Sequence, residues 1–185
     1  MQQSTHPIPP EAEGVIGIDP NQRATIRFER VLAHPIDRVW QSITEPDQME
    51  MWLAVRARVD LRVGGHFDLW LGASDSEAPV SSGTITTLDA PRRIDVAFTD
   101  GSTLSWQLHA EADATRLVFI DTRPPDERAR NSVLAGWHIR VDHLPRALDG
   151  TALDWPALDA DRNEHGYVRP MAEIYWHYRN RPRPS

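Results

Sequence analysis

The stretch AHPIDRVWQSITEPDQMEMWL, residues 33–53, predicts two short helices set end to end directly after a strand. Pro35 suits the first turn of a helix, and Thr44 with Asp47 forms a capping pair that restarts one. Helices of two or three turns are not stable alone in water, so they must pack on a larger apolar surface. The nature of that surface decides the fold.

A curved antiparallel sheet is the surface that the flanking sequence predicts. The strand ATIRFERVL precedes the helical pair, and VRARVDLRV, residues 55–63, follows it with strict alternation of apolar and polar residues. Gly64-Gly65 suits a two-residue hairpin turn into HFDLWLG. Turn signals separate four further strands, SGTITTLD, RRIDVAFT, STLSWQLHA and TRLVFIDT. We therefore expect seven antiparallel strands, with the two helices inserted after the first.

A long amphipathic helix from about Pro125 to Asp149 supplies a cover for this sheet. Its apolar stripe recurs at helical spacing and consists of Val133, Trp137, Val141, Leu144 and Leu148. A strongly curved sheet gripped by one helix leaves a volume that side chains do not easily fill, so a pocket is expected between them. The predicted fold class is α+β, a curved sheet wrapped on a long C-terminal helix.

The chain divides into three segments. Residues 1–22 are polar and rich in Pro, which predicts a mobile N-terminal arm. Residues 23–150 form the domain, and Gly150 is a plausible stop for the long helix. Residues 151–185 form an extension that we expect to pack back on the domain, with Trp155 and one helix in which Met171, Ile174, Tyr175 and Tyr178 make a stripe. A homodimer contact through this extension is the less favoured alternative.

Composition excludes several functions. The chain has no Cys, so disulfides, thiolate nucleophiles and Cys-bound metals are impossible, and all 20 basic residues are Arg, which rules out Schiff-base chemistry. The net charge of −7 and the scattered Arg residues argue against nucleic acid as a partner. No apolar run is long enough to span a membrane, and the N-terminus lacks the features of a signal peptide, so we expect a cytoplasmic protein. No cofactor is implied.

Five stretches in order carry a family resemblance: RFERVLAHPIDRVWQSITEPDQMEMWL, VGGHFDLWL, GTITTLDAPRRI, TRLVFIDT and GWHIRVDHLPRALDG. Together they resemble the bacterial SRPBCC proteins, which are START-like helix-grip domains, in the subgroup named for the C-terminal domain of the Aha-type activator of the heat-shock chaperone ATPase. The resemblance runs from about Ala24 to Gly150. It implies a cavity between seven strands and the long helix. It does not imply an activity, because this fold hosts lipid carriers, hormone receptors, polyketide cyclases and chaperone activators.

Nine residues are the candidate ligand-binding set, because they fall on core-facing positions around the expected cavity. They are Trp40, Trp52, Phe67, Leu69, Trp106, Phe119, Asp121, Trp137 and Val141. Each apolar member can also simply fill the core, but four inward Trp would together suit a flat or aromatic ligand. Asp121 shares strand parity with Leu117 and Phe119, so an inward carboxylate with a raised pKa is expected there. It is the one weak candidate for an acid.

His138 and Asp142 lie one helical turn apart, which could make half of a metal site. No third ligand occurs at a diagnostic spacing, so we expect a solvated face and no metal. The leading hypothesis is a binding module for a hydrophobic or aromatic small molecule that carries out no covalent chemistry. The alternatives are a cyclase or aromatase that uses Asp121 with a hydroxyl or His, and a module that interacts with a chaperone or another protein.

Overall fold

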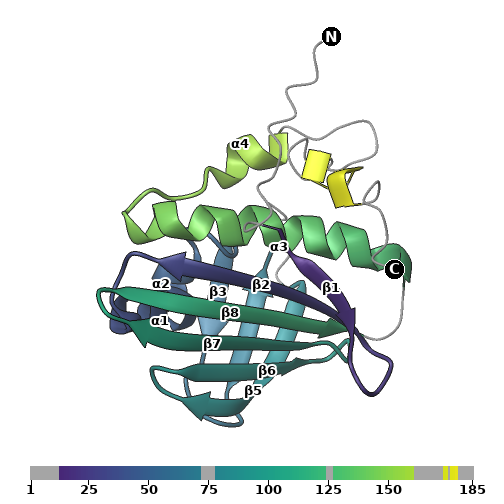
Figure 1. Ribbon diagram of the computed structural model, residues 1–185, viewed down its shortest axis with the longest axis horizontal. Coiled ribbons are helices and arrows are strands. Elements are labelled where there is room, and N and C mark those ends of the chain that lie inside the picture. The colour runs from purple at the N-terminus through teal and green to yellow at the C-terminus, as the bar shows by residue number, and fades with distance from the viewer. Residues whose placement is uncertain (1–12, 72–77, 124–126, 161–172, 175, 179–185) are drawn as a thin grey trace.

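A computed structural model describes residues 13–71, 78–123, 127–160, 173–174 and 176–178. Eight strands form one antiparallel sheet, and a long helix lies across it (Figure 1). The strands are β1 (Val15–Ile18), β2 (Ala24–Leu32), β3 (Arg56–Val59), β4 (His66–Trp70), β5 (Ser81–Asp89), β6 (Arg93–Phe98), β7 (Thr103–Glu111) and β8 (Ala114–Arg123). The helices are α1 (Ile36–Thr44), α2 (Pro46–Met49), α3 (Glu127–Leu148) and α4 (Trp155–Ala160).

The sheet order is β1-β2-β8-β7-β6-β5-β4-β3. After β2 the chain crosses to the far edge of the sheet at β3 and then returns strand by strand to β8. β8 therefore pairs with β2, along all nine residues of β2. Alternate residues of β2, β7 and β8 are buried, which is the period-two pattern of strands with one face against a cover. The cover is α3, and α1 and α2 lie at one end of the sheet (Figure 1). The α+β helix-grip architecture is thus confirmed in outline.

The predicted strand count of seven is wrong by one. The eighth strand, β1, lies within residues 1–22, which we expected to be a mobile arm, and it pairs antiparallel with β2 from Val15↔Arg27 to Ile18↔Ala24. β1 has four residues, lies at the sheet edge and exposes the side chains at both of its ends. Of its residues, only Ile16 packs against the core cluster, so the sequence shows no alternation there.

The predicted two-residue turn at Gly64-Gly65 is also wrong. β3 ends at Val59 and β4 begins at His66, so a longer loop joins them, and the apolar residues Leu61 and Val63 in it are exposed. The loop instead pairs with Ile85 of β5: the Gly64 N–H donates to the Ile85 carbonyl oxygen at 2.8 Å, and the Ile85 N–H donates to the Gly65 carbonyl oxygen at 2.9 Å. Gly65 is required there, since a Cβ at this position would lie 1.9 Å from the Asp60 carbonyl oxygen.

The helices follow the sequence in part. α1 and α2 occupy the predicted stretch, and Pro46 begins α2 as a first-turn proline. α3 matches the predicted long helix, although its predicted start at Pro125 lies outside the described residues. α4 was not predicted. In the expected tail helix, Ile174 and Tyr178 are helical, whereas Met171 and Tyr175 fall outside the described part of the chain.

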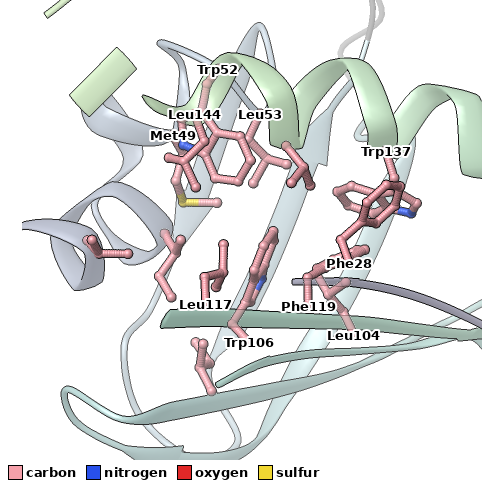
Figure 2. Packing of buried hydrophobic residues seen from close by; sticks show 14 of the residues in the cluster. Phe28, Met49, Trp52, Leu53, Leu104, Trp106, Leu117, Phe119, Trp137 and Leu144 are labelled. Carbon is pink, nitrogen blue, oxygen red and sulfur yellow. The ribbon is translucent and has the colours of Figure 1, made fainter. Parts of the chain in front are cut away.

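The core lies between the concave face of the sheet and the two helical covers (Figure 2). Trp137 and Leu144 reach into it from α3, and Met49, Trp52 and Leu53 reach into it from α2 and the turn that follows. All five are at most 7% exposed. The short helices therefore gain their stability from this packing, which answers why such brief helices persist.

Candidate functional site

Four aromatic rings, one each from the turn after α2, β7, β8 and α3, meet in the core. Trp106 of β7 is the centre, with ring centroids 5.6 Å from Trp52, 4.4 Å from Phe119 and 6.2 Å from Trp137. Phe119 and Trp137 are also in contact, at 4.5 Å. The tilted and edge-on angles are those that aromatic pairs favour over face-to-face stacking. We call Trp52, Trp106, Phe119 and Trp137 the aromatic cluster (Figure 2).

The three indole N–H groups of the aromatic cluster differ in their partners. Trp52 Nε1 donates to the Ser42 carbonyl oxygen at 2.9 Å, and Trp137 Nε1 donates to Asp121 Oδ2 at 2.6 Å. Trp106 Nε1 is buried and has no hydrogen-bond partner among the residues that the structure describes. The central ring of the cluster therefore carries an unsatisfied donor inside an apolar interior.

Asp121 closes one end of the aromatic cluster. It is 2% exposed, and its Oδ2 accepts hydrogen bonds from Trp137 Nε1 and from Arg123 Nε at 3.0 Å. Burial raises the pKa of the Asp121 carboxyl, and the charge of Arg123 only partly opposes this effect. Within the described residues, neither a hydroxyl group nor an imidazole is hydrogen-bonded to Asp121. Its two partners are donors that do not exchange protons near neutral pH, so they hold the carboxylate and do not form an acid–base pair with it.

The remaining four candidate residues are buried in the same core as the aromatic cluster. Trp40 is 8% exposed on α1, and Phe67 is fully buried on β4, where its ring contacts Phe98 at a centroid distance of 6.4 Å. Leu69 and Val141 are core residues of β4 and α3. The structure thus brings Trp52, Trp106, Phe119, Trp137 and Asp121 together, and the other four lie in the same buried core. Their role in binding a ligand stays a prediction.

His138 contradicts the expectation of a solvated face. It is 2% exposed, with Nε2 2.8 Å from Asp142 Oδ2 and Nδ1 2.7 Å from the Tyr178 hydroxyl oxygen. Arg30 Nη2 donates to Asp142 at 2.7 Å, and the Tyr178 hydroxyl also accepts from the Gly14 N–H at 2.7 Å. We call these five residues the Tyr178 network. It joins β2, α3 and both outer segments of the chain.

The only sequence signal for this network was the His138–Asp142 spacing, because its other partners are far away along the chain. Burial raises the pKa of the Tyr178 hydroxyl to about 12, so it stays protonated and serves as a hydrogen-bond donor and acceptor. Among the described residues, no group of three His, Cys, Asp or Glu is placed to hold a metal ion. A helix long and apolar enough to cross a membrane is likewise missing from that part of the chain.

An antiparallel sheet that curves around one long C-terminal helix, with two short helices inserted after β2, defines the helix-grip fold of the SRPBCC superfamily. Within that class, the chain belongs to the family described as Activator of Hsp90 ATPase homolog 1-like protein, whose model matches residues 33–149. No curated protein matches the chain.

Solved structures show the same fold. CalU16 from Micromonospora echinospora is 23% identical with a TM-score of 0.66, covering 90% of this chain and 95% of CalU16. The AHSA1-like protein from Aeromonas hydrophila is 25% identical with a TM-score of 0.56, covering 67% and 92%. DynU16, from the dynemicin biosynthetic locus, is 21% identical with a TM-score of 0.60, covering 71% of this chain and 50% of DynU16. The likeness to CalU16 therefore extends well beyond the segment that the family model matches.

Proposed function

We propose that this protein is a small-molecule-binding module that encloses an aromatic or otherwise apolar ligand between the sheet and α3, without covalent chemistry of its own. The observation that carries the proposal is the buried Trp106 Nε1, which lacks an acceptor among the described residues. The helix-grip fold supports it, and so does the origin of the structural neighbour DynU16 in a biosynthetic locus.

The unsatisfied Trp106 N–H makes the unliganded protein less stable. A buried N–H without a partner costs about 1–3 kcal/mol, and the great majority of buried polar groups in native proteins avoid this cost. A ligand oxygen that accepts from Trp106 Nε1 would recover that free energy on binding. Rings of the aromatic cluster would add about 0.5–1.5 kcal/mol for each stacked or edge-on pair with an aromatic ligand. The favoured ligand is therefore aromatic and carries a hydrogen-bond acceptor.

The test uses two ligands of nearly equal shape that differ in one acceptor, 2-acetylnaphthalene and 2-isopropenylnaphthalene, in which a CH2 group replaces the carbonyl oxygen. Binding is followed by quenching of Trp fluorescence and by the shift in Tm. The wild-type protein should bind the ketone about five- to tenfold more tightly, since a hydrogen bond of about 1 kcal/mol corresponds to roughly this ratio. Trp106→Phe, which keeps a ring and removes the donor, should abolish the preference.

Trp70→Phe is the matched control. Trp70 Nε1 is also buried without an acceptor among the described residues, but its ring lies under the Arg56 guanidinium at 3.9 Å and is no part of the aromatic cluster. This variant should keep the preference for the ketone. Equal affinity of the wild-type protein for the two naphthalenes would contradict a hydrogen bond from Trp106 to the ligand. Binding of neither naphthalene would count against the binding function itself.

A cyclase-type enzyme is the second candidate, favoured by the raised pKa of the buried Asp121. A buried carboxyl group with a raised pKa can act as a general acid. Incubation with a linear poly-β-keto thioester tests this candidate: formation of a ring product by the wild-type protein, lost in Asp121→Asn, would favour the enzyme. The family takes its name from an activator of the Hsp90 ATPase. That activity is a property of the protein so named, and we do not propose it for this chain.

A further inference from the structure

Arg140 of α3 lies where α3 meets the segment after α2 and the end of β4, and we call this place the Arg140 corner. Its Nε donates to the Leu53 carbonyl oxygen at 2.8 Å, its Nη2 to the Leu71 carbonyl oxygen at 2.9 Å, and its Nη1 to the Gly136 carbonyl oxygen at 2.9 Å. Leu53 follows Trp52 of the aromatic cluster, and Leu71 follows the last residue of β4. The partly buried guanidinium therefore lies at the edge of the enclosed core, one turn along α3 from Trp137.

The charge of Arg140 has no counter-ion in the part of the chain that the structure describes. Its three recorded partners are neutral carbonyl groups, and burial lowers the pKa of its guanidinium to about 10. Several other arginines do have a carboxylate partner: Arg30 pairs with Asp142, Arg58 with Asp68 and Arg93 with Asp95. A partly desolvated cation is stabilised most by an opposite charge, so this corner favours an anion.

The number of free N–H groups on the Arg140 guanidinium matches one carboxylate. A guanidinium has five N–H groups, and the three carbonyls use the one on Nε and one on each terminal nitrogen. One N–H on Nη1 and one on Nη2 remain, which is enough for a carboxylate to accept two hydrogen bonds from neighbouring nitrogens. The three carbonyls meanwhile fix the plane of the guanidinium, so little side-chain freedom is lost when an anion binds.

An indole provides the wall of this corner. The Arg140 guanidinium lies 5.7 Å from the ring centroid of Trp155 in α4, which runs along α3 (Figure 1). Trp155 Nε1 donates to the Glu50 carbonyl oxygen at 2.8 Å, and the Leu153 N–H donates to the Met51 carbonyl oxygen at 2.7 Å. These two hydrogen bonds hold Leu153 and Trp155 against the segment after α2, so that the indole lies beside the cation.

We propose that Arg140 is the anchor for the carboxylate of an aromatic acid, with the ring of that acid directed toward the enclosed core. This inference rests on the proposed binding function and deepens it, because it names the ligand class as an aryl carboxylic acid. Arg140 is a binding residue in this scheme, and Trp155 is the aromatic wall that accompanies it.

The test uses a second matched pair, 2-naphthoate and 2-naphthamide, with affinities measured by isothermal titration calorimetry at pH 7. The wild-type protein should bind naphthoate at least tenfold more tightly than the amide, and the preference should weaken as salt increases, since an ion pair is screened. Arg140→Gln should bring the ratio to about one, and Arg140→Lys should retain part of it. Arg93→Gln, which removes one exposed positive charge from the sheet, should leave the ratio unchanged.

The ratio of two affinities on one sample is independent of the fraction that is correctly folded, so a destabilised variant still reports. Equal binding of acid and amide by the wild-type protein overturns the anion site and leaves the binding function standing. A preference for the acid that persists in Arg140→Gln also overturns it, because another residue then holds the carboxylate. If neither naphthalene nor any other aromatic probe binds, the proposed function fails together with the inference.

Discussion

Tyr178→Phe tests whether the Tyr178 network holds the end of the chain to the domain. The substitution keeps the ring and removes one hydroxyl group, which donates to His138 Nδ1 and accepts from the Gly14 N–H. The donor role follows from the His138 tautomer: Nε2 faces the Asp142 carboxylate and carries the proton, so Nδ1 is the acceptor. Both hydrogen bonds are buried, so the variant leaves one donor and one acceptor unsatisfied.

The expected cost follows from these two bonds. Each contributes about 1–1.5 kcal/mol, so the free energy of unfolding should fall by about 2–3 kcal/mol. At about 2–4 °C per kcal/mol for a domain of this size, Tm should fall by roughly 5–10 °C. Differential scanning calorimetry measures this change. Hydrogen exchange of the Gly14 amide should also accelerate, because its acceptor is lost.

His177→Gln is the matched control for Tyr178→Phe. The His177–Glu13 pair also joins the two ends of the chain, at 2.8 Å, but His177 is one-third exposed. A pair of this kind contributes at most about 1 kcal/mol. An unchanged Tm and unchanged Gly14 exchange in Tyr178→Phe would refute the network as a stabilising element.

Three further substitutions have effects whose sign or order the structure sets. Burial raises the pKa of Asp121, so its ionisation opposes folding, and Asp121→Asn should gain stability relative to the wild type as pH rises from about 4 to 7. Burial also opposes ionisation of Asp142, but its hydrogen bonds outweigh this effect and lower its pKa. Asp142→Asn should therefore cost stability at pH 7 and little at about pH 3. Thermal unfolding of both variants across pH checks that their stabilities change in opposite directions, and parallel changes would contradict the assignment. Gly65→Ala should lower the free energy of unfolding in urea more than Gly64→Ala does, because the new Cβ at Gly65 would lie 1.9 Å from the Asp60 carbonyl oxygen. At Gly64 only the positive φ of 81° opposes a side chain, at a cost of about 1–2 kcal/mol. Equal losses in the two variants would contradict the close contact.

Local periodicity explains the elements that could be predicted. The alternation in β2 and β8 and the spacing of Trp137, Val141 and Leu144 in α3 repeat over enough residues to define one buried face. The inward position of Asp121 follows from the same strand parity, and it is buried against Trp137. These patterns also carried the family resemblance, which the family model confirms over residues 33–149.

Nonlocal partners explain what could not be predicted. The alternation of VRARVDLRV continues past the end of β3, so Leu61 and Val63 looked like core residues although both are exposed. β1 is too short for a period and exists because β2 offers it an edge. His138 lies beside the apolar stripe of α3 and is covered by residues far away along the chain, Phe28 of β2 and Tyr178, which follows 40 residues later.

The pairing of β2 with β8 bears on how this domain can be cut. The family model begins at residue 33, after the last residue of β2. A fragment trimmed to those boundaries would bare one side of β8, a ten-residue strand in the interior of the sheet, and remove the inward-facing Ile26 and Phe28. Such an open edge can pair with the same edge of another molecule, so the shortened protein should self-associate more strongly than the longer one.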